Sequence, residues 1–414
     1  MHHANDAIIF DWNRQDPRPL AALRAVELND ETLRDGIQSP SVTDPPIEEK
    51  LAIMRALDAL GVHALDVGLP GAGQRAVQDS RVLLEAIRDE KLRIKPNCAA
   101  RTVAADIAPI IKLSEEVGVE VEVMGFLGTS PVRKLAENWD DALLEQRTRD
   151  AARMVRAAGL PFGFVTEDTV RSHPTTLRRL FTAAVEEGAG RLCLCDTVGH
   201  VDPNGVRNLV RWTRDLLMGL GTDTKIDWHG HSDRGLGLIN SLVAAEEGAH
   251  RIHGTILGVG ERVGNTALDQ LLVNLKLMGL FPGDLSGLAP LVERVSGACG
   301  VPIPVQYPVF GRDAFRTGTG VHAAAVIKAL RNGDETLADQ VYSGVPAGWF
   351  GRQQEIEIGH MAGDSNILFW LNRRGIEPEP ELVTAIRTVA KAGNRVLETE
   401  EVMAIIDQHR AAQA

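Results

Sequence analysis

Short β-forming runs alternate with longer amphipathic segments along most of this 414-residue chain. Eight runs are predicted strands, and each follows its predecessor after roughly the interval that a βα unit needs: residues 24–29, 63–67, 93–97, 119–126, 162–166, 191–195, 225–228 and 250–255. Helical patterns lie between them, among them residues 47–60, 106–117, 141–158, 176–188, 203–220 and 237–248. Eight strands alternating with helices predict an α/β fold, a (β/α)8 or TIM barrel, with an open doubly wound sheet as the alternative.

The βα rhythm ends near residue 282, and the sequence after it predicts a small, mostly helical appendage. Helical patterns occur at residues 293–297, 320–331, 365–374 and 380–392, with a short segment at 354–358 and a polar tail at the end. We therefore expect three regions: an N-terminal leader at 1–20, a catalytic TIM barrel at 21–285 and C-terminal helical subdomains at 286–414.

The composition argues against several classes of function. The net charge is −12, whereas a general nucleic-acid surface needs clustered Lys and Arg. No apolar run approaches the roughly 18 residues of a membrane span, and the N-terminus lacks a signal-peptide pattern. Four cysteines form no disulfide framework in a chain this long, and Cys193 and Cys195 are interpreted as small buried hydrophobic residues. We expect a cytoplasmic protein with no membrane and no nucleic-acid partner.

A barrel fold predicts where functional polar residues should occur in the sequence, because active sites of such barrels lie at the C-terminal ends of the strands. Polar residues do gather after nearly every predicted strand, in the segments 30–38, 66–68, 128–131, 166–171, 196–200, 229–231 and 258–265. A single Asp at a strand end is usually a helix cap. The repetition at one strand end after another predicts a site at this face.

His229 and His231 are separated by one residue at the end of the seventh predicted strand. Side chains two apart on a strand point to the same face, so both rings can reach one metal ion; two ordinary histidines are the alternative. Asp35, at the end of the first strand, is the best carboxylate partner, because only the eighth strand separates the first and seventh in a closed barrel. Asn265 can add an amide oxygen, or it caps the next helix. Gly230 would keep space between the rings.

Arg34 and Glu167 are candidate catalytic residues. The guanidinium of Arg34 keeps its charge and suits a carboxylate or enolate oxygen, and the alternative is an ion pair with Glu167 or Asp168. Glu167 suits an acid or base, although it can also merely hold an arginine in place.

Two further features suit substrate binding. Thr197 can donate a hydrogen bond to a substrate carboxylate, or it caps the helix that follows. Gly258 and Gly260 precede a predicted helix start and suit a phosphate or pyrophosphate, although a lone GxG is weak evidence.

Taken in order, these motifs resemble those of the DRE-TIM metallolyase superfamily, which includes 2-isopropylmalate, homocitrate and citramalate synthases and the hydroxymethylglutaryl-CoA lyases. The resemblance covers about residues 25–280 and is carried by RDGxQ at 34–38, EDxxR at 167–171, DTVGxxxP at 196–203, HxHxDxG at 229–235 and GxGERxGN at 258–265. Gln38, followed by Ser39 and Pro40, is closest to the isopropylmalate synthase form. The resemblance implies a TIM barrel, with Gln38 and Thr197 as substrate-binding residues.

The resemblance continues past the barrel and favours a synthase. His322, in Gly-Val-His, resembles a histidine that is implicated in catalysis from the appended subdomain of the synthases, and Tyr342 resembles their Tyr in a Tyr…Pro…Gly segment. Lyases of the family lack this appendage and carry a Cys in the glycine loop, where this chain has Glu261 and Arg262. The feedback-regulated synthases continue into a further regulatory domain, so inhibition by leucine through it is not expected here.

Some positions depart from the family pattern and leave the substrate open. They are Ile37 for an acidic residue, Asp66 for a Glu, Arg133 where many synthases have a His, Ser232 for an Asn and Thr317 for another His. Arg133 in the pocket would suit a more anionic substrate, and it can equally be a surface residue.

The resemblance implies the condensation of acetyl-CoA with a 2-keto acid, followed by thioester hydrolysis, and an enzyme most like 2-isopropylmalate synthase. Homocitrate, citramalate and other alkylmalate synthases are alternatives, as is a carbon–carbon lyase. The third class is a barrel without activity that serves as a binding module. A divalent metal (Mg, Mn or Zn), acetyl-CoA as cosubstrate and a homodimer are expected.

Overall fold

The computed structural model describes residues 10–14 and 26–413, which fall into two compact units. One unit comprises Arg14–Gly283 with Pro290–Pro302, and the other comprises Asp284–Ala289 and Ile303–Ala414 together with the residues up to Asn13. Most of the predicted leader, and residues 24 and 25 of the first predicted strand, lie outside the described residues.

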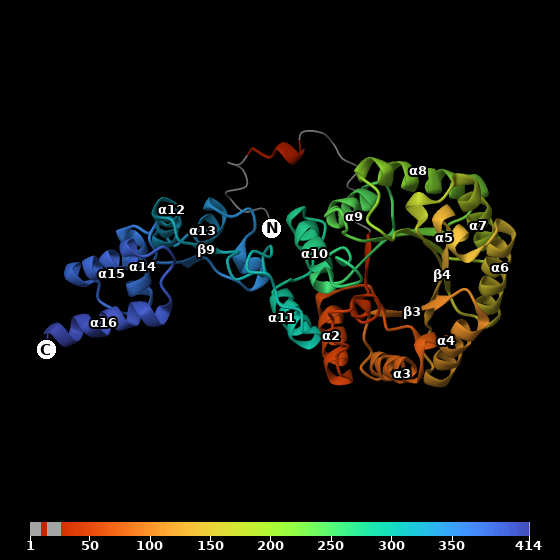
Figure 1. The fold of residues 1–414 in the computed structure, drawn as a ribbon, viewed down its shortest axis with the longest axis horizontal. Coiled ribbons are helices and arrows are strands. Elements are labelled where there is room, and N and C mark those ends of the chain that lie inside the picture. The colour runs from red at the N-terminus through yellow and green to blue at the C-terminus, as the bar shows by residue number, and fades with distance from the viewer. Residues whose placement is uncertain (1–9, 15–25, 414) are drawn as a thin grey trace. The chain divides into compact units, whose positions relative to one another are not determined.

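Eight parallel strands close into a barrel, so the TIM-barrel prediction is confirmed and the open sheet is wrong. Figure 1 shows the strands as an inner ring with the helices outside it. The strands are β1 Glu27–Asp30, β2 Ala64–Asp66, β3 Lys95–Arg101, β4 Glu122–Gly128, β5 Phe162–Glu167, β6 Arg191–Asp196, β7 Lys225–Gly230 and β8 Arg251–Gly254. They pair in sequence order, and β8 closes the ring by pairing Gly254 with Asp30 of β1.

Helices follow the strands, as the (β/α)8 pattern requires. They are α2 Ile47–Leu60, α3 Gln74–Asp89, α4 Ala104–Val117, α5 Pro131–Glu137, α6 Asp141–Ala157, α7 Pro174–Glu186, α8 Pro203–Leu220, α9 Gly237–Glu246, α10 Leu268–Leu277 and α11 Leu288–Cys299. The bounds predicted for α2 and α8 agree with the structure, whereas α3, α5 and α10 were not predicted.

Capping residues explain why several of these helices begin where they do. The side chain of Asp202 accepts a hydrogen bond of 2.9 Å from the Gly205 amide, and Pro203 occupies the first turn of α8. Asp140 caps α6 in the same way by accepting from the Leu143 amide at 2.8 Å. These caps fix the start of each helix and therefore the length of the loop that leaves the preceding strand.

Charged side chains from several strands meet inside the barrel. Asp227 of β7 accepts hydrogen bonds of 2.8 Å from both Arg191 of β6 and Arg251 of β8. Arg251 also lies 2.7 Å from Glu122 of β4. Met124, Cys193 and Cys195 form a buried hydrophobic cluster with Val165, which confirms that both cysteines are buried. Nη2 of Arg251 lies 3.6 Å from Sδ of Met124, so the charged group and this cluster are in contact.

The C-terminal unit is mostly helical, as predicted. It contains α12 Gly320–Arg331, α13 Glu335–Val341, α14 Asp364–Arg373, α15 Pro380–Ala392 and α16 Thr399–Gln413, with two short parallel strands, β9 Arg316–Thr317 and β10 Glu355–Ile356. The predicted polar tail is wrong, because α16 packs Val402 and Ile406 into a core with residues of α14 and α15. A helix can look polar when only one narrow face is apolar.

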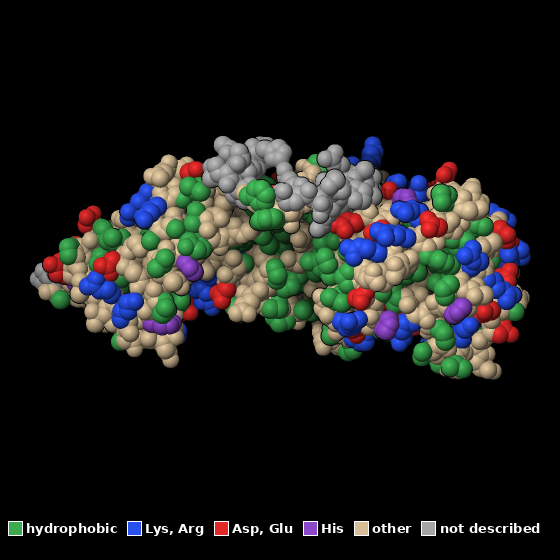
Figure 2. Space-filling model, turned by 90° about the horizontal axis from the view of Figure 1, so that it is seen from above, with side chains coloured by type: hydrophobic (Ala, Val, Ile, Leu, Met, Phe, Trp, Pro, Cys, Tyr) green, Lys and Arg blue, Asp and Glu red, His purple; other side chains and the backbone are tan. Residues whose placement is uncertain are grey.

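The surface carries charges of both signs. Figure 2 shows Lys and Arg side chains interspersed with Asp and Glu on the visible face of the barrel unit. Within the described part of the chain, no helix is long and apolar enough to cross a bilayer.

Candidate active site at the mouth of the barrel

A cavity of about 460 Å³ opens at the C-terminal ends of the strands. Every strand, or the segment after it, contributes to its lining, which is formed by Glu31, Arg34, Asp35, Gln38, Leu69, Ala99, Met124, Phe126, Arg133, Val165, Glu167, Cys193, Cys195, Thr197, His229, His231, His253, Glu261 and Arg262. The polar segments that follow the predicted strands therefore converge on one cavity.

His229, His231 and Asp35 form a compact polar group in this cavity. The Nε2 atoms of the two histidines lie 3.1 Å apart, because the alternation of β7 turns both rings to the same side. The Asp35 carboxylate lies 3.9 Å from Nε2 of His231. One ligand atom from each of the three residues lies within 4.8 Å of the other two, which is the spacing of a metal site.

Asn265 joins this group from the loop after β8. Its Nδ2 donates to Oδ2 of Asp35 at 2.6 Å, and its backbone forms an antiparallel bridge with His231. The helix-cap alternative is wrong, because α10 begins three residues later at Leu268 with Ala267 as its cap. Gly264 allows the two ends of this loop to lie close together: its φ is +90°, and a Cβ there would lie 1.8 Å from the Gly258 carbonyl oxygen.

The residues in this group fit a divalent cation. Two imidazole nitrogens, a carboxylate and an amide oxygen are donors that Mg, Mn and Zn accept. Nδ1 of His231 and Oδ1 of Asn265 are buried and have no hydrogen-bond partner among the described residues. Two Nε2 atoms that face each other at 3.1 Å also need a proton or a cation between them.

Arg34 is held by three carboxylates at the edge of this group. Its Nε donates to Asp66 at 2.7 Å, its Nη1 donates to Asp35 at 2.6 Å, and its Nη2 lies 3.1 Å from Glu31. The predicted alternative partners, Glu167 and Asp168, are wrong. Burial raises the pKa of Asp35, but Arg34 and then His229 outweigh it, so the pKa of this carboxyl lies below its usual range.

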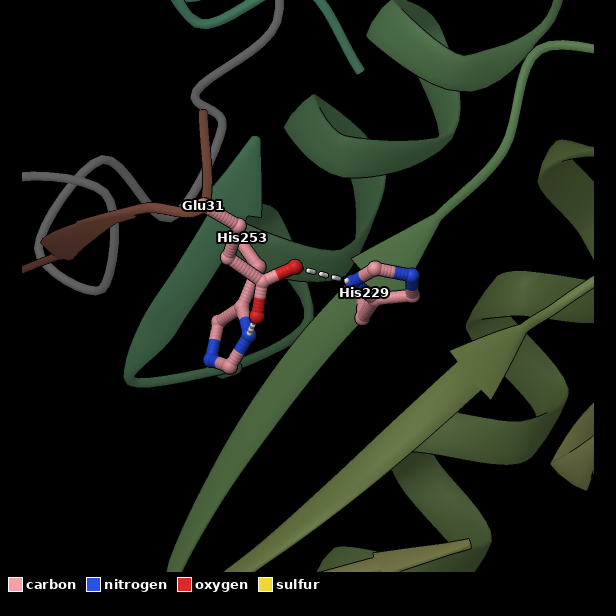
Figure 3. A group of neighbouring side chains, drawn as sticks. All are labelled: Glu31, His229 and His253. Atoms are coloured by element: carbon pink, nitrogen blue, oxygen red, sulfur yellow. Dashed lines mark hydrogen bonds and ion pairs between the residues drawn. The ribbon is translucent and has the colours of Figure 1, made fainter. Parts of the chain in front are cut away.

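The sequence analysis missed Glu31 and His253. Figure 3 shows the Glu31 carboxylate between two imidazoles: Oε2 lies 2.8 Å from Nδ1 of His229, and Oε1 lies 2.8 Å from Nδ1 of His253. The second ring nitrogen of His253, Nε2, lies 3.2 Å from Asp227. A sequence signal for His253 was present. His253 and Arg251 are two residues apart on β8, so both ionisable side chains point to the same face of the strand, which is the barrel interior.

The two histidines of the pair have opposite pKa shifts. Burial lowers the pKa of His229, but the charge of Glu31 and a hydrogen bond to it outweigh burial and raise that pKa to about 9. Burial and the nearby charge of His229 lower the pKa of His231 to about 4. His231 is therefore a neutral imidazole near neutral pH, which is the form that binds a metal.

Thr197, Glu167 and Arg133 line the opposite rim. The Thr197 hydroxyl oxygen accepts from the Asp168 amide at 2.8 Å, which leaves its proton to donate; the helix-cap alternative is wrong because Asp202 caps α8. Arg133 lines the pocket with a side chain that stays 42% exposed, and its Nε lies 3.5 Å from Glu167. Burial raises the pKa of Glu167, although Arg133 lowers it.

Two expectations about glycines are wrong. A Cβ at Gly230 would lie 2.9 Å from Nε1 of Trp228, so this glycine makes room for the tryptophan and not between the imidazoles. No helix follows Gly258 and Gly260 directly, and a Cβ at Gly260 would lie 2.2 Å from Nδ2 of Asn265. These glycines let the loop approach Asn265, and their role toward a phosphate stays a prediction.

His322 and Tyr342 belong to the C-terminal unit. Their rings lie against each other, with centroids 4.2 Å apart, and both side chains are exposed. His322 lies on α12, and Tyr342 follows α13 directly. Their predicted catalytic role stays a prediction.

Comparisons with known proteins show the family to which this chain belongs. The HMGL-like family model matches residues 25–289. The homocitrate synthase AksA of Methanopyrus kandleri is 33% identical over 389 residues, which is 91% of each chain, and the 2-isopropylmalate synthase of Sulfolobus acidocaldarius is 28% identical over 90% of this chain and 93% of its own. The hydroxymethylglutaryl-CoA lyase from Pseudomonas aeruginosa superposes with a TM-score of 0.56 at 18% identity, covering 66% of this chain and 93% of the lyase, which shows a shared fold.

The chain therefore belongs to the HMGL-like family, the DRE-TIM group that its motifs resemble. Its relatives among the synthases include enzymes named for homocitrate, citramalate and 2-isopropylmalate, so the family leaves the keto acid open.

Proposed function

We propose that this protein condenses acetyl-CoA with a 2-keto acid and hydrolyses the resulting thioester. The new carbon–carbon bond joins the acetyl methyl carbon to the keto carbon, and water cleaves the C–S bond, so that a 2-hydroxy dicarboxylate, CoA and a proton are formed. The observation that carries this proposal is the Asp35, His229, His231 and Asn265 group beside Arg34 in one cavity. The synthase names of relatives that match about 90% of the chain support it.

In this proposal Asp35, His229, His231 and Asn265 hold a divalent cation. When bound, the cation supplies Lewis acidity that makes a keto carbon more electrophilic. Mg, Mn and Zn all suit this mixed donor set. The resting positions of these side chains are set by Asn265, which binds Asp35 at 2.6 Å, and by Glu31, which lies 2.8 Å from His229.

Arg34, Gln38 and Thr197 would orient the keto acid. Arg34 keeps its charge and has N–H groups left beyond its bonds to Asp35 and Asp66, so it can stabilise the alkoxide that develops at the keto oxygen. The Thr197 proton is free to bind the keto acid's carboxylate, because its oxygen accepts from the backbone. Glu261 and the glycine loop at 258–260 would contact the CoA side of the pocket.

Proton transfer is assigned to His322, Tyr342 and Glu167. His322 and Tyr342 are the leading candidates for the base that takes a proton from the acetyl methyl group. Glu167, whose pKa is raised by burial, is the candidate for an acid or base within the cavity. A homodimer that places the C-terminal unit of one chain at the barrel of the other belongs to this proposal, and a cytoplasmic location stays a prediction from the sequence.

Free-thiol release from acetyl-CoA tests the proposal. Release should require a 2-keto acid and should stop when a chelator removes divalent metal, because both substrates and the cation act in one cavity. The absence of thiol release with every keto acid of a broad panel would overturn the synthase. Cleavage of a 3-hydroxy-3-methylacyl-CoA would identify a lyase instead.

A further inference from the structure

A buried chain of charged side chains leads from the candidate metal group into the barrel. Oε1 of Glu31 lies 2.8 Å from Nδ1 of His253, and Nε2 of His253 lies 3.2 Å from Oδ2 of Asp227. The same Asp227 oxygen accepts a hydrogen bond of 2.8 Å from Arg251. All four residues are at most 3% exposed, so bulk water has little access to these bonds.

The register of the barrel strands holds this chain in line. Asp227 of β7 pairs with Arg251 of β8, and His253 of β8 pairs with Asn29 of β1. Side chains two residues apart on a strand point to the same face, so His253 shares the inward face with Arg251. Glu31 stands two residues after Asn29, and its amide still bonds to the β8 backbone. Strand backbone, and not a loose loop, therefore sets the distances between these groups.

Both ring nitrogens of His253 face carboxylate oxygens, those of Glu31 and Asp227. Burial raises the pKa of each carboxyl, but a neighbouring guanidinium, Arg34 for the first and Arg251 for the second, outweighs it and holds the pKa below its usual range. Both groups are therefore carboxylates, which only accept hydrogen bonds. A neutral imidazole would turn a lone pair to one of them, so His253 carries a proton on each nitrogen and donates to both.

The bond from His253 decides which way the Glu31 carboxylate turns. With Oε1 bound to Nδ1 of His253, Oε2 faces Nδ1 of His229 at 2.8 Å (Figure 3). Arg34 and Asn29 also contact Oε1, at 3.1 and 3.4 Å, and Arg34 is shared with two further carboxylates. The shortest contact to Oε1 is thus the one from His253, a charge-assisted bond whose donor is fixed on its far side.

We propose that His253 is a positioning residue of the metal site. Its Nδ1 holds the Glu31 carboxylate, Asp227 holds the ring through Nε2, and Glu31 in turn orients the His229 ring for a cation. This inference rests on the metal group of the proposed function. Partners that orient a metal-binding histidine in this way contribute about 10- to 100-fold to metal affinity.

Two amide variants of His253 separate its two bonds. The amide nitrogen of Asn is attached to Cγ, as Nδ1 is, so His253→Asn keeps a donor for Glu31 and loses the one for Asp227. The amide nitrogen of Gln lies one bond further out, at the place of Nε2, so His253→Gln keeps a donor for Asp227 and loses the one for Glu31. Each variant loses one buried hydrogen bond and one charge, and both should lower the free energy of unfolding in urea by similar amounts.

Isothermal titration of the full chain with Mn²⁺ tests the inference. His253→Gln should weaken Mn²⁺ binding by about 10- to 100-fold, whereas His253→Asn should stay within about threefold of the wild-type protein. His250→Gln is the matched control: His250 directly precedes β8, accepts from the Ile226 amide at 3.1 Å and does not line the cavity, so its replacement should leave the affinity unchanged.

The outcomes distinguish this inference from the proposed function. Equal Mn²⁺ affinities for His253→Gln and His253→Asn would give His253 a structural role only and overturn the inference, with the condensation untouched. Wild-type protein that binds no Mn²⁺ would instead overturn the metal site on which the proposed function rests. If His253→Gln does not fold, His253→Ala, which lacks both donors, takes its place in the comparison with His253→Asn.

Discussion

Nδ1 of His229 lies 2.8 Å from Oε2 of Glu31, and the other oxygen of the same carboxylate is shared with His253. A carboxylate at Nδ1 holds the proton on that nitrogen and fixes the plane of the ring. The Nε2 atom of His229 is then directed at Nε2 of His231, and a cation that binds there would displace the proton that the raised pKa of His229 keeps on this nitrogen. In the proposed metal site, Glu31 would therefore be a positioning residue, which holds the His229 ring in place for a cation.

Glu31→Gln should weaken divalent metal binding by about 10- to 100-fold, because the amide cannot hold the ring as the carboxylate does. Isothermal titration with Mn²⁺ measures the change. Glu27→Gln is the matched control: Glu27 begins β1, the strand that Glu31 directly follows, and it pairs with Arg191, away from the metal group. Equal affinities for Glu31→Gln and the wild-type protein would show that Glu31 has no part in positioning.

His229→Ala should abolish stoichiometric Mn²⁺ binding and, with it, thiol release. The variant loses one of the two imidazoles, together with the ring that Glu31 holds in place, and keeps only His231, Asp35 and Asn265. His200→Ala serves as a control, because His200 is exposed and does not line the cavity. Wild-type metal affinity in His229→Ala would show that the metal does not bind at this group of residues.

His322→Ala should spare metal binding and lower kcat by about 10²- to 10⁴-fold, the contribution of a positioned general base. The two effects separate because His322 belongs to the C-terminal unit and the metal group to the barrel. Titration with Mn²⁺ and a thiol-release assay on the same preparation measure both. Wild-type turnover in this variant would exclude His322 as the base.

Asp227→Asn should destabilise the protein at neutral pH by about 3–5 kcal/mol, because Arg191 and Arg251 would lose their shared buried carboxylate. Burial raises the pKa of Asp227, but Arg251 and a hydrogen bond to His253 hold it well below the usual range. The stability it contributes is therefore present above its unfolded pKa of about 3.9 and is lost as the pH falls toward its folded value.

The difference in unfolding free energy between wild type and Asp227→Asn should accordingly shrink below about pH 4. Urea unfolding at pH 7 and at acid pH measures it. Asp150→Asn, on the exposed face of α6, should change stability by less than about 0.5 kcal/mol. If the difference in unfolding free energy stays constant or grows toward acid pH, the stabilising role assigned to the Asp227 carboxylate is wrong.

The sequence predicted the fold and much of the cavity lining because the signals for both are local. Alternation of strand and helix patterns is read from neighbours in the chain, and residues such as Asp35 and His229 follow strands whose ends must meet. Side-chain contacts between residues far apart in the sequence leave no local pattern from which they could be predicted. The contact of Arg34 with Asp66 and the place of Glu31 between two imidazoles depend on register around the ring.

One glycine was misassigned although a local pattern would have placed it. Gly230 was assigned to the histidines because they flank it, yet it faces Trp228 on the other side of the strand. The alternation of β7 decides this, and counting along the strand would have shown that 228 and 230 share a face. Arg133 likewise entered the cavity only through α5, a seven-residue helix too short to give a clear period.

Mass spectrometry of the products from acetyl-CoA labelled with ¹³C at both acetyl carbons tests the central claim most directly. With Mn²⁺ and a 2-keto acid that supports thiol release, we predict a 2-hydroxy dicarboxylate that carries both labels, together with an equal amount of free CoA, and no such product after chelation. Labelled acetate and free CoA without that product would show hydrolysis without condensation and would contradict the account.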